Sequence, residues 1–321
     1  RCRYSTNHGL KLEELFNAES APLATDTREL EAPVGPALVQ WRSVDADASG
    51  PELGSDAAGP LRRCRPHRTC QSVLGVVGNG NGPECDIAVD PVDGTSVTAS
   101  GRAHAISVIA VADKGTMYNP KDVFYMDKLI TRIEGKGVVS LDASAEENVR
   151  ELAKALKKDV SEITVAMIDR PRHVALMEAV RRAGARTRLF LDGDVAAGIH
   201  AVTGGGNIDM LLGIGGAPEG AISACATQAL NGYMQGRIAP QSPEELKRAT
   251  AAGHDMEKIF EINDLVASDN TYFVATGVTD GLLLDGVKKN GEYLTTDSII
   301  LRARSGTIRR VKADYLASRW A

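Results

Sequence analysis

Alternating strands and helices from residue 74 onward constrain this fold more than any other feature of the sequence. Short apolar runs predict strands, and stretches with helical spacing of apolar residues follow most of them. The predicted strands cover residues 85–89, 105–111, 163–168, 186–191 and 208–212, and the predicted helices end near residues 158, 182, 201 and 230. Ser144 and Glu147 have capping-box spacing and mark where the first helix begins. This alternation predicts βαβ units, an α/β fold and a largely parallel sheet.

Polar residues follow each of the last three predicted strands. The three clusters are Asp169-Arg170-Pro171-Arg172-His173, Asp192-Gly193-Asp194 and the glycine-rich segment from Gly213 to Gly220. In open α/β sheets, ligands bind beyond the carboxyl ends of the strands. We therefore expect the three clusters to meet at one edge of a sheet.

The first two clusters each have a functional and a structural interpretation. Arg170 and Arg172 flank the rigid Pro171, and their guanidinium groups match phosphate oxygens, although a surface arginine pair also forms salt bridges. The carboxylates of Asp192 and Asp194 can bind a metal or accept hydrogen bonds from sugar hydroxyls. An aspartate before a helix is also a favoured N-cap, so this alternative stays open.

The third cluster brings backbone N–H groups to a helix N-terminus, which is a ready anion site. It lacks the Lys-Ser/Thr pair of a P-loop and the glycine spacing of a dinucleotide-binding turn. Glu219 would repel a phosphate unless a metal ion lay between the two. Glu219 is therefore a candidate metal ligand.

A further acidic motif, Asp90-Pro91-Val92-Asp93-Gly94-Thr95-Ser96, follows the apolar run 87–89. Pro91 has no backbone donor and is expected to end the strand, which leaves Asp90 and Asp93 at its mouth. Oxygen-only ligands favour Mg²⁺ or Mn²⁺ over zinc. The alternative is an ordinary Asp-Pro turn with a capping aspartate.

Together, the acidic residues, the arginine pair and Thr95 fit metal-assisted phosphoester hydrolysis. The sequence offers no Ser-His-Asp or Cys-His nucleophile, and we interpret His104 and His173 as structural.

Composition excludes several other classes of protein. The 321 residues carry a net charge of −5, which argues against nucleic acid or an anionic membrane as the main partner. We find no apolar run long enough to span a bilayer and no signal-peptide pattern. The five scattered cysteines indicate a reducing cytoplasm. Cys64, His67 and Cys70 have metal-ligand spacing, but a single such cluster is weak support for zinc.

The chain changes character near residue 75. Residues 1–75 show little periodicity beyond a short predicted helix from Lys11 to Ala18, and we treat them as an atypical N-terminal segment. Residues 76–321 form the expected catalytic region, with two α/β lobes at about 76–160 and 161–321.

Several motifs of the catalytic region resemble one known family. They are Asp86 to Thr95, Ala105 to Val108, Asp113 to Gly115, Phe124 to Lys128, Arg170 to His173, Asp192 to Ala196, Gly213 to Gly220, Ser268 to Asn270, Ala275 to Thr279 and Ser305 to Arg309. The first resembles the motif of the lithium-sensitive, metal-dependent sugar and inositol phosphatases. The whole set, in order over residues 76–316, resembles class II fructose-1,6-bisphosphatase of the GlpX type.

The resemblance implies a layered sugar phosphatase fold with alternating α and β layers. It further implies Mn²⁺ or Mg²⁺ as cofactor, hydrolysis of the 1-phosphate of fructose 1,6-bisphosphate in gluconeogenesis, and a homodimer or homotetramer.

Site residues carry over by position. Asp90, Asp93 and Glu219 match metal ligands, and Asp90, Asp93 and Thr95 match catalytic residues, with Thr95 orienting the water. The positions that match substrate-binding residues are Asp93, Gly94, Thr95, Tyr125, Arg170, Pro171, Arg172, Asp192, Gly193, Asp194 and Gly216.

One departure from the family is large. The family carries upstream Gly-Asp-Lys and Gly-Glu-Gly-Glu motifs that supply metal ligands and a lysine, and residues 1–75 contain neither. The segment is either divergent or the product of a shifted reading frame that returns to register near Gly75; the abrupt return of the match favours the second. Two other functions therefore stay open: a catalytically impaired sugar-phosphate-binding relic, and a phosphatase for sedoheptulose 1,7-bisphosphate or an inositol phosphate.

Overall fold

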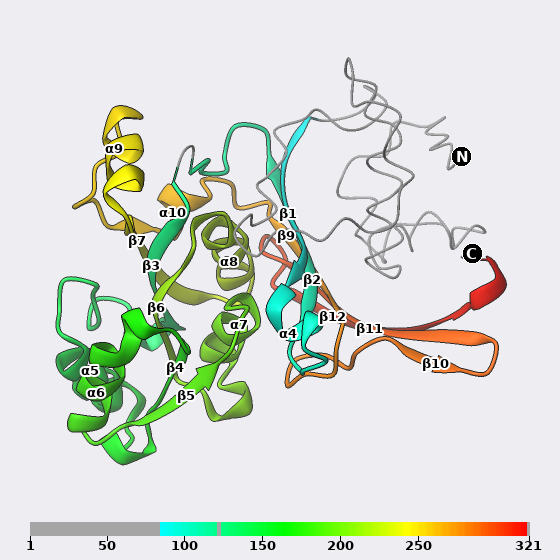
Figure 1. Cartoon of the computed structure of the whole chain (residues 1–321), viewed down its shortest axis with the longest axis horizontal. Helices are drawn as coiled ribbons and strands as arrows, with labels where there is room; N and C mark the ends of the chain where they lie inside the picture. The colour runs from blue at the N-terminus through cyan, green and yellow to red at the C-terminus, as the bar shows by residue number, and fades with distance from the viewer. Residues whose placement is uncertain (1–83, 121–122, 320–321) are drawn as a thin grey trace. The chain divides into compact units, whose positions relative to one another are not determined.

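Two six-stranded sheets organise the part of the chain that the structure describes (Figure 1). The structure is a computed structural model, and it describes residues 84–120 and 123–319. Both sheets belong to one compact unit that begins at Cys85. The predicted helix from Lys11 to Ala18 and the cluster of Cys64, His67 and Cys70 lie outside the described residues.

The first sheet is antiparallel throughout, and we call it the antiparallel sheet. Its strands are β1 (Cys85–Asp93), β2 (Ile106–Asp113), β9 (Tyr272–Gly277), β10 (Lys288–Asn290), β11 (Tyr293–Arg302) and β12 (Thr307–Leu316). They run in the order β1-β2-β9-β11-β10, with β12 also paired to β11.

The second sheet combines both strand directions, and we call it the mixed sheet. Its strands are β3 (Tyr125–Arg132), β4 (Thr164–Ile168), β5 (Arg186–Phe190), β6 (Met210–Gly216), β7 (Gly232–Ile238) and β8 (Phe260–Glu261). The order is β5-β4-β6-β3-β7-β8, and only the pairs β4–β5 and β4–β6 are parallel.

The helices form two layers of their own. They are α4 (Thr95–Ala99), α5 (Ala145–Leu156), α6 (Val174–Arg182), α7 (Val195–Thr203), α8 (Ala217–Ala229), α9 (Pro243–Ala251) and α10 (Ile262–Leu265). α7 and α8 lie between the sheets, while α5 and α6 cover the outer face of the mixed sheet (Figure 1). The order α, β, α, β is the layered fold predicted from the sequence. α8 is buried around most of its circumference and is rich in alanine, which lets strands of both sheets approach it.

A core fills each space between layers. One core lies between the two sheets and around α7 and α8, and includes Val108, Ile130, Ile222 and Phe273. The other lies beneath α5 and α6, where Leu152 and Val180 pack on Val165 and the neighbouring strands. Ser144 caps α5 through a capping box with Glu147, as the spacing predicted.

The prediction of a largely parallel sheet is wrong. β6, α8 and β7 do form a strand–helix–strand unit, but β3 lies between β6 and β7 and pairs antiparallel with both. Strand–helix alternation fixes the relative direction of consecutive strands, not which earlier strand is inserted between them.

Pro91 does not end the strand either. β1 continues to Asp93, with a register shift between Asp90 and Asp93 that accommodates the proline. β1 is an edge strand, and a proline at an edge or a bulge leaves no ladder hydrogen bond unmade.

Each sheet takes its strands from a different part of the chain. The antiparallel sheet combines strands from 85–113 and 272–316, and the mixed sheet takes its strands from 125–261. Among the residues that the structure describes, no helix is long and apolar enough to cross a membrane.

Candidate active site

Four strand ends supply the residues of the site. β4, β5 and β6 deliver the three polar clusters at the carboxyl edge of the mixed sheet, and β1 delivers Asp90 and Asp93 from the antiparallel sheet. The Val195 N–H donates to Asp93 Oδ2 (3.3 Å) and the Ser96 N–H donates to Asp192 Oδ2 (2.9 Å), which connects β1 and α4 to the residues that follow β5. Arg170 pairs with Asp192, and Arg172 donates to the Ile214 carbonyl, which connects the three clusters. The expected convergence of the clusters is therefore present.

The carboxylates form one electrostatically linked cluster. Burial raises the pKa of Glu219 to about 7, with Asp194 and Asp90 adding to the rise and Lys128 opposing it. Burial also raises the pKa of Asp90 to about 6, with Asp192 and Asp194 contributing. The pKa of Asp93 lies well above its ordinary value because of burial and the charges of Asp90, Asp194 and Glu219. Such mutual repulsion favours any cation that enters.

Two glycines at the end of β6 make room for two of these carboxylates. A Cβ at Gly215 would lie 1.9 Å from Asp194 Oδ2, and a Cβ at Gly216 would lie 1.8 Å from Glu219 Oε2. No other residue type permits this approach. The glycine-rich segment therefore lets two carboxylates approach the end of β6. The sequence had suggested that its backbone N–H groups bind an anion instead.

The donor set fits a hard divalent metal. Glu219 Oε2 is shut off from solvent and has no hydrogen-bond partner among the described residues, and all candidate ligands are carboxylate oxygens. Within residues 84–120 and 123–319, however, no three acidic, histidine or cysteine side chains form a preassembled metal-binding group. Asp90, Asp93 and Glu219 thus interact electrostatically, but their oxygens are not arranged as a complete metal-binding site.

Lys128 belongs to the site, although the sequence motifs assign it no role. This lysine in the middle of β3 has no exposed surface, and its Nζ lies 2.5 Å from Asp194 Oδ2 and 3.0 Å from the Gly216 carbonyl oxygen, to which it donates. A signal existed: Met126, Lys128 and Ile130 occupy alternate positions of one strand, so the lysine shares a buried face with two apolar residues.

The arginines line the other side of the strand ends. Arg172 donates from Nη2 to the Ile214 carbonyl (2.8 Å), and its guanidinium carbon lies 5.1 Å from the centre of the Tyr125 ring. Arg170 donates from Nη1 to the Leu191 carbonyl (2.5 Å) and pairs with Asp192 Oδ1 at 3.4 Å. The salt-bridge alternative thus holds for Arg170, whereas the Arg172 charge meets no carboxylate within ion-pair distance among the described residues.

The remaining predicted residues occupy the surface or the frame of the site. Gly94 is the left-handed N-cap of α4, and Thr95 is the exposed first residue of that helix. Pro171 begins the short 3-10 helix Pro171–His173. His173 has a structural position: its Nδ1 contacts the Ile168 carbonyl (2.7 Å), and its Nε2 accepts from the Ile214 N–H (2.8 Å), which makes Nδ1 the protonated nitrogen.

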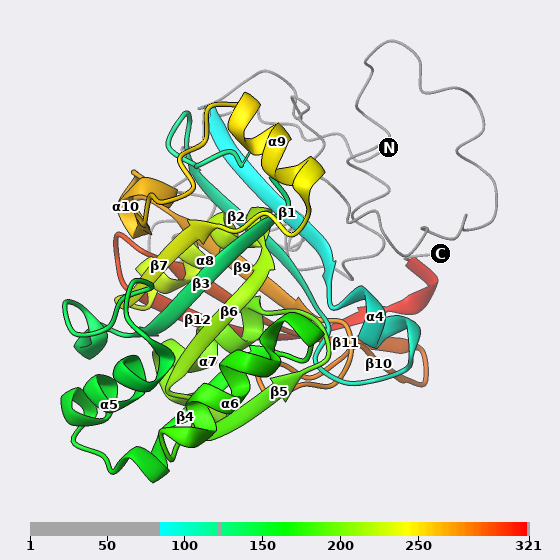
Figure 2. The same ribbon diagram turned by 60° about the vertical axis from the view of Figure 1, so that its left-hand side comes forward.

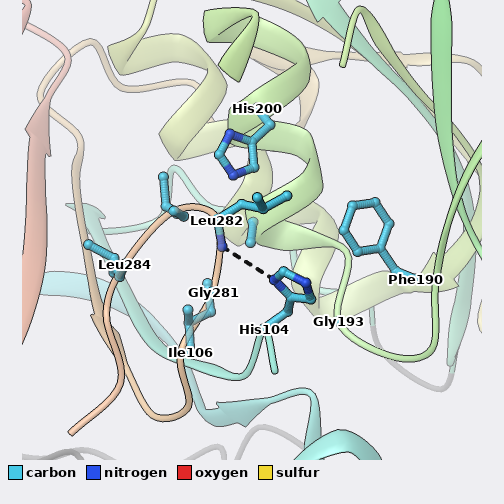
Figure 3. Close-up of a pocket in the computed structure, with 10 residues that line it drawn as sticks. His104, Ile106, Phe190, Gly193, His200, Gly281, Leu282 and Leu284 are labelled. Carbon is cyan, nitrogen blue, oxygen red and sulfur yellow. Dashed lines mark hydrogen bonds between the residues drawn. The ribbon is translucent and has the colours of Figure 1, made fainter. Parts of the chain in front are cut away.

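A cavity of about 10 Å³, room for about one water molecule, lies beside Gly193 (Figure 3). His104 and His200 face it, and His104 Nδ1 accepts from the Leu282 N–H (3.3 Å). Burial lowers the pKa of His200 to about 4. Among the described residues, no acidic side chain lines this cavity, but Gly193 borders it and also lies against the Asp93 carboxylate.

The layered α/β fold and the acidic strand ends are those expected of a layered sugar phosphatase. Residues 72–315 match the family of bacterial fructose-1,6-bisphosphatases that are glpX-encoded, and the chain belongs to this family. The protein named fructose-1,6-bisphosphatase 1 class 2 from Escherichia coli K12 is 40% identical over 256 residues, which cover 76% of this chain and 76% of that protein. The fructose-1,6-bisphosphatase class 2 proteins of Escherichia coli O6:H1 and Shigella flexneri match with the same identity and coverage. The family resemblance and its extent are thus confirmed.

Proposed function

We propose that this chain hydrolyses the 1-phosphate of fructose 1,6-bisphosphate with the help of Mn²⁺ or Mg²⁺. The observation that carries the proposal is the cluster of Asp90, Asp93 and Glu219, in which Glu219 Oε2 is buried without a partner among the described residues. Family membership supports the reaction and the metal dependence.

In this proposal Asp90, Asp93 and Glu219 hold the metal. A divalent ion bound there lowers the pKa of a water molecule and offsets the charge of the phosphate. The Thr95 hydroxyl can both donate and accept a hydrogen bond, and its exposed position beside Gly94 leaves it free to orient that water. Gly94 and Asp93 contact the phosphate that is attacked.

The sugar bisphosphate lies along the strand ends of the mixed sheet. Tyr125, Arg170, Pro171 and Arg172 hold its phosphate-bearing part, because guanidinium forks match phosphate oxygens. Asp192, Gly193, Asp194 and Gly216 face the sugar hydroxyls. Exchange of the Ile214 and Leu191 carbonyls for phosphate oxygens would give each arginine a stronger, charge-assisted partner.

Phosphate release from fructose 1,6-bisphosphate with Mn²⁺ tests this function. Asp90→Asn keeps the size of the side chain and removes its charge, so the activity should be lost. An unchanged rate in Asp90→Asn would refute the assigned chemistry. Sedoheptulose 1,7-bisphosphate and inositol 1-phosphate, assayed in parallel, decide between the substrates. The family matches at Tyr125, Arg170 and Arg172 favour a sugar bisphosphate.

The relic hypothesis predicts a different result. A chain that lacks the upstream ligands would bind fructose 1,6-bisphosphate and resist unfolding in its presence without turning it over. We further propose that residues 1–75 are a separate, atypical segment ahead of the catalytic region. Sequencing of the encoding DNA tests the shifted frame: a clean frame in which no one-base change restores the acidic motifs would exclude it.

Two further parts of the proposal concern the setting of the enzyme. The scattered cysteines support a reducing cytoplasm. A homodimer or homotetramer is the expected assembly, and light scattering of the purified protein measures it.

A further inference from the structure

We propose that Lys128 is a positioning residue for sugar recognition, which holds Asp194 and the Gly216 peptide in place from beneath the site. The inference rests on the proposed function, because it assigns Asp194 and Gly216 to the sugar-binding part of that site. Lys128 itself touches no substrate in this proposal.

Lys128 occupies a position where a charged side chain is energetically unfavourable without suitable partners. It lies on β3, between β6 and β7 in the mixed sheet (Figure 2), with no exposed surface. Removing an ammonium group from water is unfavourable unless good partners replace the water. Met126 and Ile130 on the same strand face show that apolar side chains suit this layer, so packing alone does not require a lysine.

The partners of Lys128 come from two different strand ends. Asp194 follows β5 and begins α7, and Gly216 ends β6 and precedes α8. One Nζ contacts both, at 2.5 Å from Asp194 Oδ2 and 3.0 Å from the Gly216 carbonyl oxygen. The lysine therefore fixes the spacing between two of the clusters predicted to meet the substrate.

This arrangement also decides what Asp194 offers to a ligand. Lys128 engages Oδ2, and the Asp194 side chain makes no capping hydrogen bond to α7. An ionised carboxylate accepts and does not donate. Asp194 therefore presents one fixed acceptor, which suits a sugar hydroxyl and would repel a phosphate.

Lys128→Met tests the proposal in the full-length chain with Mn²⁺ present. Methionine has a similar length and no charge, so Asp194 should lose its fixed orientation. We expect KM for fructose 1,6-bisphosphate to rise about thirtyfold, with kcat changed less than about threefold, because the lost contact serves the bound substrate and the transition state alike. A role confined to stability would leave KM of the folded fraction unchanged.

Calorimetry supplies a readout that does not depend on turnover. Binding of fructose 6-phosphate should weaken about thirtyfold in Lys128→Met, whereas binding of inorganic phosphate and of Mn²⁺ should stay within about threefold of wild type. Loss of Mn²⁺ or phosphate binding together with sugar binding would overturn the proposal, since Lys128 would then serve the whole acidic cluster.

A double-mutant cycle shows whether Lys128 acts through Asp194. Asp194→Asn removes the charge that pairs with Lys128, and should weaken fructose 6-phosphate binding by itself. In that background Lys128→Met should have a smaller effect than in wild type, because only its contact with the Gly216 carbonyl keeps its full strength. Additive effects would overturn the proposal. If Lys128→Met does not fold, unaltered fructose 6-phosphate binding in Asp194→Asn would overturn it equally. Failure of the proposed function is distinct, because the wild-type chain would then not release phosphate from fructose 1,6-bisphosphate.

Discussion

The two ends of strand β6 both bury carboxylates, yet they treat them in opposite ways. Asp209 precedes the strand and is almost fully buried: its Oδ1 lies 2.6 Å from Lys158 Nζ and 3.5 Å from Arg132 Nη2, and its Oδ2 accepts from the Thr164 N–H at 3.1 Å. At the other end, Asp90, Asp93, Asp194 and Glu219 form a cluster in which Lys128 forms an ion pair with Asp194 alone among the described residues, and Glu219 Oε2 has no partner among them.

The difference teaches how to distinguish a structural carboxylate from a functional one. Both residues have carboxylate oxygens that are shut off from solvent, and they differ in whether those oxygens have partners: both Asp209 oxygens do, whereas Glu219 Oε2 has none among the described residues. An unsatisfied, buried oxygen is unfavourable in the free protein and becomes favourable when a cation arrives. Variants at the two ends of β6 should therefore lose different properties, activity at one end and stability at the other.

The largest effect is expected from Glu219→Gln. The variant keeps the shape of the side chain but removes a metal ligand, so kcat/KM for fructose 1,6-bisphosphate should fall roughly a thousandfold, about 4 kcal/mol in transition-state stabilisation. Phosphate release at saturating Mn²⁺ measures it. Glu178→Gln, an exposed change on α6, is the matched control and should leave the rate unaltered. Comparable rates in both variants would remove Glu219 from the site.

Asp209→Asn should show the reverse pattern. It leaves Lys158 and Arg132 without their carboxylate, so the free energy of unfolding should fall by about 3 kcal/mol. Its kcat/KM per folded molecule should stay within about threefold of wild type, because Asp209 lies at the end of β6 remote from the acidic cluster. Urea unfolding and the phosphate assay measure the two quantities. A loss of activity in the folded fraction would contradict the assignment of Asp209 to a purely structural role.

The third prediction concerns pH and metal. The pKa of Glu219 is raised to about 7 and that of Asp90 to about 6 by burial and mutual repulsion. A raised pKa in the folded state stabilises that state at low pH, and this stability is lost as pH rises through 6 and 7. The metal-free protein should therefore lose on the order of 2 kcal/mol between pH 5 and pH 8 from this cluster, and Mn²⁺ should restore it at pH 8.

Unfolding by urea at pH 5, 6.5 and 8, with a chelator or with Mn²⁺, measures this dependence. Glu219→Gln is the control, and its unfolding free energy should decline less over the same interval. Equal pH dependence in wild type and Glu219→Gln would show that the cluster does not carry the effect. Asp209→Asn should keep the wild-type slope, because the saturated end of β6 is not involved.

The contrast also shows how much of the site could be predicted from the sequence. Asp192, Asp194 and Glu219 are predictable because polar residues follow predicted strands, and the carboxyl ends of β4, β5 and β6 do lie together. Lys128 is not, because it stands inside a strand, where its partners depend on β3 lying beside β6. That neighbour relation crosses more than 80 residues of sequence, and the local pattern of β3 does not contain it.

For the fold as well, some local elements were predictable from the sequence and strand pairing was not. Local signals located five of the twelve strands and four of the seven α-helices of the described part to within a few residues, since capping and apolar periodicity act within one element. β3 and β7 to β12 were not predicted. The predicted proportion of parallel strand pairs was wrong, because β3 lies between β6 and β7 and pairs antiparallel with both.

The smallest expected effect separates the two arginines of the contrast. Arg132 at the structural end faces Asp209, whereas Arg172 at the functional end contacts a carbonyl and the Tyr125 ring, so its charge is available to a phosphate. Arg172→Lys keeps the charge but loses the planar guanidinium group and its contact with the Tyr125 ring. KM for fructose 1,6-bisphosphate should therefore rise about tenfold, or about 1.4 kcal/mol, with kcat changed less than about threefold.

Arg132→Lys is the control, and should lower the free energy of unfolding without altering KM. If both variants raise KM equally, the arginine beside Asp209 also serves the substrate, and saturation of a carboxylate no longer identifies a structural end.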